Sequence, residues 1–122
     1  MQLTISQREK QGVIILELNG RLVLGEECEA FRGLIRELLA ARKSHILVSL
    51  ADVVRIDSTG IGAMVESVIL TAKQGGRLKL FHLPRLIRNI LTTHRLLQAF
   101  DIYETEDEAL ASFATEAHPA AG

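Results

Sequence analysis

Residues 54–62, VRIDSTGIG, place a carboxylate, two hydroxyl groups and two glycines between an apolar run and a helix-like segment. Asp, Ser and Thr at a helix start can accept hydrogen bonds from the unpaired N–H groups of the first turn. A hydroxyl group at the same place could instead receive a phosphate, because the positive end of the helix dipole favours negative charge. The residue types leave both hypotheses open: a helix cap, or a Ser58 that is the substrate of another protein.

Three enzyme hypotheses fit this stretch poorly. A nucleophile elbow requires Gly-x-Ser-x-Gly, but Ile56 stands where the first glycine should be, and no histidine spacing links a base to Ser58. The chain has no Gly-x-x-x-x-Gly-Lys-Ser/Thr run for nucleotide phosphates. A phosphoryl-accepting Asp57 would need acidic Mg²⁺ ligands after the first strand, where the sequence offers only Glu17. We therefore expect no catalytic residue and no enzyme activity.

The composition is that of one ordinary domain. The chain has 122 residues, 48% hydrophobic and 24% charged, with a formal net charge of -1 and a pI near 6.4. No basic surplus indicates nucleic acid or anionic lipid, and no apolar run approaches membrane length. The single Cys28 belongs to no metal-ligand spacing. We expect a cytoplasmic protein without metal or cofactor, without direct nucleic acid binding and without membrane insertion.

The elements that must position the stretch follow the order ββαβαβαβα. An N-terminal hairpin turns at Gln11-Gly12 and ends at Asn19-Gly20, and strand and helix patterns alternate after it. The later elements are predicted as helix 25–43, strand 45–50, a helix with a stripe over 61–72, strand 77–83, helix 84–95, strand 100–103 and a helix capped by Thr105 and Glu108. This order predicts an α/β fold whose sheet has a parallel centre, with binding at the carboxyl ends of its strands.

Apolar stripes predict which helix faces are buried. The residues expected to point inward are Phe31, Leu34, Ile35, Leu38 and Leu39 in the first helix, Ile61, Met64, Val65, Val68, Ile69 and Ala72 in the second, Leu86, Ile87, Ile90 and Leu91 in the third, and Ala109, Leu110 and Phe113 in the last. In the second helix, Gly60, Gly62 and Ala63 leave a nearly bare first turn that a partner could approach closely.

Residues 51–110 resemble the STAS domain of anti-sigma factor antagonists, the bacterial anti-anti-sigma proteins. The run Asp-Ser-Thr-Gly-Ile-Gly matches their Asp-Ser-Ser/Thr-Gly-Leu/Ile-Gly signature, and Gly75-Gly76 before a strand and the acidic last helix fall where that family has them. The resemblance extends over residues 3–115. It implies a single STAS domain at 1–115, a mixed sheet with helices after the hairpin, and a flexible tail at 116–122.

The resemblance also implies a partner switch. In this family the unmodified antagonist binds an anti-sigma factor that is also a serine kinase, and so regulates transcription indirectly. Phosphorylation of the serine after the motif aspartate weakens docking, and a serine phosphatase restores it. Position by position that serine is Ser58, with Asp57, Thr59 and Gly60 as binding neighbours and Gly62 and Ala63 in the same first turn.

One turn departs from the family pattern. Many members carry an acid-rich turn after the second strand, where part of the partner surface lies, whereas this chain has Arg21 and Val23 there. Arg21 is expected to be among the partner-binding residues, and the departure is either ordinary loop variation or a sign that this member binds a different kinase or another STAS-using assembly. An alternative hypothesis is a constitutive STAS adaptor subunit of a stress-signalling or lipid-transport assembly, in which the loop serves docking alone.

Overall fold

The structure is a computed structural model that describes residues 2–117. Its elements are β1 (Leu3–Lys10), β2 (Val13–Leu22), α1 (Glu26–Ala40), β3 (His45–Ile56), α2 (Ser58–Lys73), β4 (Arg77–Phe81), α3 (Arg85–Thr93), the 3-10 helix η1 (Leu97–Ala99), β5 (Ile102–Tyr103) and α4 (Glu106–Ala117). The predicted order ββαβαβαβα is confirmed. Helix α4 takes up the first two residues of the predicted tail, and residues 118–122 lie outside the described part of the chain.

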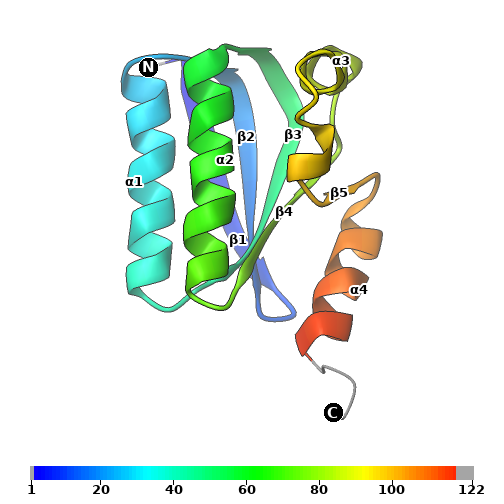
Figure 1. Cartoon of the computed structure of the whole chain (residues 1–122). Coiled ribbons are helices and arrows are strands. Elements are labelled where there is room, and N and C mark those ends of the chain that lie inside the picture. The colour runs from blue at the N-terminus through cyan, green and yellow to red at the C-terminus, as the bar shows by residue number, and fades with distance from the viewer. Residues whose placement is uncertain (1, 118–122) are drawn as a thin grey trace.

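The strands form one mixed sheet in the order β1-β2-β3-β4-β5. The β1–β2 hairpin is antiparallel and the other three pairings are parallel, which confirms the predicted parallel centre. Helices α1, α2 and α3 pack on one face of the sheet over the larger apolar core. Helix α4 covers a smaller apolar cluster on the opposite face, so it lies away from the start of α2 (Figure 1).

The hairpin turns where the sequence predicts, but β2 does not end where expected. Gln11 and Gly12 both have positive φ, 54° and 77°, as a two-residue turn between twisted strands requires. Asn19-Gly20 was predicted to end the second strand, and this is wrong: β2 continues to Leu22 because the long β3 stays paired with it across two register shifts. The longer strand brings Leu22 into register with Ile56 at the end of β3.

Strand β3 is also longer than the predicted 45–50, since it runs to Ile56. Val53 and Ile56 are buried, and Asp52 and Arg55 face solvent, so the added residues still present an apolar side to the core. Asp57 therefore follows the strand directly, and α2 starts at the next residue. The strand-to-helix junction that the sequence predicts is confirmed.

The buried face of α2 differs from the predicted stripe. Ser67 and Thr71 are buried, and their hydroxyls donate to carbonyl oxygens one turn earlier, at 2.8 Å and 2.6 Å. Because these bonds satisfy the hydroxyl groups, small polar residues can face the sheet. Ile69 is 50% exposed and Ala72 is exposed, so neither points inward as predicted. The helix thus keeps apolar side chains at its surface.

The other helices agree more closely with their patterns. In α1 the predicted stripe is buried except for a half-buried Leu34. In α3 only Ile87 and Leu91 are buried, Ile90 is half-buried, and Leu86 is 51% exposed, against the prediction. Helix α4 begins at the predicted capping box, in which the Glu108 N–H donates to Thr105 Oγ1 at 3.2 Å, and it buries the three predicted residues.

Candidate functional site

Asp57 caps α2 and also holds the neighbouring loop. Its Oδ1 accepts a hydrogen bond from the Gly60 N–H at 2.9 Å, and its Oδ2 accepts one from the Leu24 N–H, also at 2.9 Å. These hydrogen bonds hold the pKa of the Asp57 carboxyl below its ordinary value, and the bond from Leu24 has the largest effect. Partial burial acts in the opposite direction. One carboxylate therefore ties the start of α2 to the loop between β2 and α1.

Gly60 allows the start of α2 to lie directly against the end of β2. A Cβ atom at this position would stand 2.2 Å from the Leu22 carbonyl oxygen and 2.9 Å from Ile56 Cγ1. No side chain larger than hydrogen fits there without moving the helix. Because the carbonyl belongs to backbone, the position of the helix start is fixed by the sheet.

Ser58 is the first residue of α2, and its side chain is exposed. Within the described chain its hydroxyl makes no hydrogen bond, so Oγ is free to meet another protein. The next residue, Thr59, is only partly exposed. The structure thus presents the Ser58 hydroxyl at the N-terminal, positive end of the α2 dipole. In the same turn, the charged Asp57 already accepts a hydrogen bond from the Gly60 amide.

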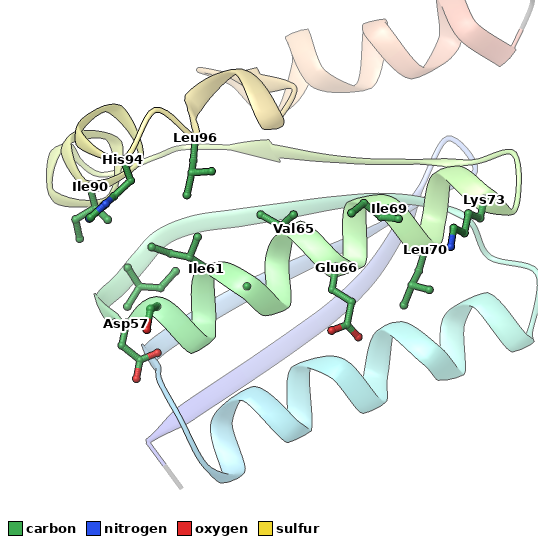
Figure 2. A pocket seen from close by; sticks show the side chains of 13 residues that line it. Asp57, Ile61, Val65, Glu66, Ile69, Leu70, Lys73, Ile90, His94 and Leu96 are labelled. Carbon is green, nitrogen blue, oxygen red and sulfur yellow. The ribbon is translucent and has the colours of Figure 1, made fainter.

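A groove of about 840 Å³ begins at this helix start and runs along the outer side of α2 (Figure 2). Asp57 lies at one end of it and Lys73 at the other. Its walls are mostly apolar, with Ile61, Val65, Ile69 and Leu70 from α2, and Ile90 and Leu96 from the α3 side. Ser58 therefore stands at the end of an apolar surface that no other described element covers.

The structure brings the predicted site residues together but does not give them all the predicted role. Gly62 is exposed with open space around it, and Thr59 is partly exposed. Gly60 and Ala63 are buried, so the prediction that they contact a partner directly needs correction. Their small size serves the packing of α2 on the sheet instead.

Arg21 lies at the end of β2, where it pairs in register with Arg55. It is partly exposed, and its Nε atom is buried without a hydrogen-bond partner among the described residues. Its backbone N–H donates to the Gln2 carbonyl oxygen at 2.8 Å, so Arg21 lies between the segment that leads into β1 and the end of β3. Its contact with a partner stays a prediction.

Several residues around the site were not singled out from the sequence. Leu24 is 72% exposed although its backbone is bonded to Asp57, and His94 lies in the groove at the end of α3. A signal for the groove existed: α2 carries more apolar residues than one buried face can hold, so some had to remain outside. No local pattern pointed to Leu24.

Residues 2–117 contain no group of three His, Cys, Asp or Glu side chains placed to hold a metal ion. In the same range, no helix has the length and apolar character needed to cross a membrane.

Comparison with known proteins gives one family. The STAS domain model matches residues 4–109. The chain is 27% identical over 111 residues to an anti-sigma F factor antagonist from Paenibacillus polymyxa, which covers 90% of this chain and 94% of that relative. It is 36% identical over 69 residues to an anti-sigma-B factor antagonist from Bacillus subtilis strain 168, covering 57% of this chain and 55% of the relative.

A solved structure from the same class of protein also superposes on this chain. The crystal structure of a candidate anti-sigma factor antagonist from Thermotoga maritima superposes with a TM-score of 0.84 at 25% identity, over 90% of this chain and 94% of that one. The predicted single STAS-like α/β domain is confirmed. The chain therefore belongs to the STAS domain family, with anti-sigma factor antagonists among its homologues.

Proposed function

We propose that this protein is an anti-sigma factor antagonist that works as a phosphorylation-controlled partner switch in the cytoplasm. With Ser58 unmodified it binds an anti-sigma factor that has serine kinase activity, and so regulates transcription without contacting nucleic acid. The relatives named as antagonists support the class of protein. The single observation that carries the proposal is the exposed Ser58 hydroxyl at the start of α2, at the end of an apolar groove.

The chemical step belongs to the kinase. Its ATP loses the γ-phosphoryl group as the bond to the ADP oxygen breaks and a bond from Ser58 Oγ to phosphorus forms. The hydroxyl proton passes to a base on the kinase. A serine phosphatase hydrolyses the phosphate and regenerates the hydroxyl group. The antagonist itself contributes an accessible acceptor held on a rigid helix start.

The groove supplies the docking surface in this proposal. Val65 and Ile69 are four residues apart on α2, with Val65 half-buried and Ile69 50% exposed, and such a row can interdigitate with side chains of a partner helix. Ser58 lies one turn before Ile61, so a docked partner would cover the hydroxyl as well. The surface and the modified atom are thus continuous.

A phosphate on Ser58 would oppose docking for an electrostatic reason. It adds about -1.5 to -2 charges at neutral pH. The Asp57 carboxylate is already charged and already accepts from the Gly60 N–H, so the phosphate would gain no hydrogen bond from that amide. A partner would then have to desolvate two neighbouring anions at the edge of an apolar contact, which is costly.

The test is to incubate the protein with serine-kinase anti-sigma factors from the same genome and ATP, and to map the phosphate by mass spectrometry. We expect a single phosphate on Ser58, none in Ser58→Ala, and an unmodified Thr59 in both. A kinase that binds the protein but phosphorylates another residue, or none, would refute the proposal.

A further inference from the structure

Leu24 has an unusual combination of exposure and backbone order. It is the most exposed large hydrophobic residue of the described chain, at 72%, so its side chain gains little from the fold. Its N–H nevertheless donates to Asp57 Oδ2 at 2.9 Å, a charge-assisted bond across 33 positions of sequence. The next residue, Gly25, has a φ of 116°, which side chains rarely adopt. The fold therefore holds in place the backbone that carries this exposed apolar side chain.

This backbone lies next to Ser58. Asp57 directly precedes Ser58, and its second oxygen contacts the Leu24 backbone. In Figure 2 the Asp57 carboxylate points away from Ile90 and His94, the α3 side of the groove. Leu24 thus lies on the opposite side of the helix start from α3. A protein that brings a catalytic site onto Ser58 Oγ therefore also comes close to Leu24.

We propose that Leu24 is an apolar anchor that enters a recess beside the active site of the kinase that modifies Ser58. Asp57 is its positioning residue. The inference rests on the proposed function, and it commits to the kinase as the occupant because the carboxylate that holds the Leu24 backbone belongs to the residue directly before the serine that the kinase modifies. An anchor whose backbone is already held in place loses little backbone freedom on binding, which favours affinity.

This anchor also gives the turn after β2 a role in choosing the partner. Val23 and Leu24 are apolar, so a kinase with a charged surface facing this turn would have to desolvate its charges without gaining a partner for them. A kinase with an apolar recess would bind. Leu24 thus influences which kinase binds, while the phosphoryl transfer to Ser58 stays the same.

The experiment compares Ser58 phosphorylation kinetics of the wild type with Leu24→Ala, Leu24→Met and Leu86→Ala. Leu86 is the matched control, since it is 51% exposed and does not line the groove. We expect Leu24→Ala to raise KM at least about tenfold with kcat nearly unchanged, because the anchor acts in binding. Leu24→Met and Leu86→Ala should stay close to wild type, and all three variants should unfold at nearly the wild-type temperature.

The outcomes separate the two proposals. If the kinase phosphorylates the wild type on Ser58 and Leu24→Ala has an unchanged KM, the anchor is wrong while the switch stands. Equal KM increases in Leu24→Ala and Leu86→Ala, or a loss confined to kcat, would also overturn the anchor. If no kinase modifies the wild type on Ser58, the proposed function itself fails, and the anchor fails with it.

Discussion

Gly60 and Gly62 offer the sharpest test of how the start of α2 is built. Both glycines lie in the same turn of one helix, so each gains the same helix propensity when changed to alanine. A Cβ atom at Gly60 meets the Leu22 carbonyl oxygen at 2.2 Å, whereas a Cβ atom at Gly62 meets nothing within 4 Å. We expect Gly60→Ala to destabilise the protein and Gly62→Ala to stabilise it.

The magnitudes follow from these distances. Carbon and a carbonyl oxygen approach no closer than about 3.3 Å in ordinary contacts, so Gly60→Ala requires the helix start to retreat by about 1 Å. Overpacking of this kind costs about 1–3 kcal/mol, partly offset by a helix propensity gain of at most about 1 kcal/mol. Gly62→Ala has only the helix propensity gain, without a steric cost. We therefore expect the two variants to differ by about 2 kcal/mol in the free energy of unfolding.

Urea unfolding followed by far-UV circular dichroism measures this difference, and the chain has no tryptophan that would report it by fluorescence. Similar m-values in the two variants would show that the native and unfolded states remain comparable. If Gly60→Ala were as stable as Gly62→Ala, the close contact between α2 and the end of β2 would be wrong, and with it the fixed position of Ser58.

Three further predictions concern single side chains. Ser58→Asp should weaken kinase binding at least about tenfold in calorimetry, or 1.4 kcal/mol, and Ser58→Ala should retain it; equal affinities would contradict the electrostatic account. Asp57→Asn should cost about 1 kcal/mol of stability near neutral pH by removing the acceptor for Leu24. Because the folded pKa of Asp57 lies below its ordinary value, this stabilisation is present above about pH 4 and is lost as the pH falls through the folded pKa. The free energies of unfolding of the wild type and of Asp57→Asn should therefore converge in acid, and a difference between them that persists in acid would exclude this cause. Cys28 is buried, and burial raises the pKa of its thiol, so it should react with a thiol reagent far more slowly in the native protein than in urea; equal rates would refute its burial.

Local patterns were enough to predict much of the fold. The turn at Gln11-Gly12 depends on two adjacent residues, and the cap of α4 depends on Thr105 and Glu108, which are three residues apart. Both are correct because the interactions that decide them lie within the same short segment. The strand-to-helix junction at Asp57 belongs to the same class, since the capping bond to Gly60 also spans three residues.

Features that depend on distant segments could not be predicted in this way. β2 continues past Asn19-Gly20 because β3 is long enough to pair with it, and no local signal reports that length. Val65 and Ile69 remain at the surface because Ser67 and Thr71 occupy the sheet-facing side of α2 with their hydroxyls satisfied. The apolar pattern alone cannot distinguish a buried side from a docking surface.

The contact between Asp57 and Leu24 shows the same limit at the site itself. The sequence leaves Asp57, Ser58 and Thr59 open as caps, and it carries no information that the second carboxylate oxygen of Asp57 accepts from a backbone group on another loop. Gly60 was likewise predicted as a partner contact, although its small size is needed for packing against Leu22. Site residues chosen from a motif thus include some that position the site and some that touch a partner.

The most direct test of the switch is the affinity of the cognate serine-kinase anti-sigma factor for two forms of this protein, measured by calorimetry. One form is unmodified and the other carries a single phosphate on Ser58, with mass spectrometry confirming the site. We predict that the unmodified form binds and that the phosphorylated form binds at least about tenfold more weakly. Equal affinity of the two forms would contradict the account.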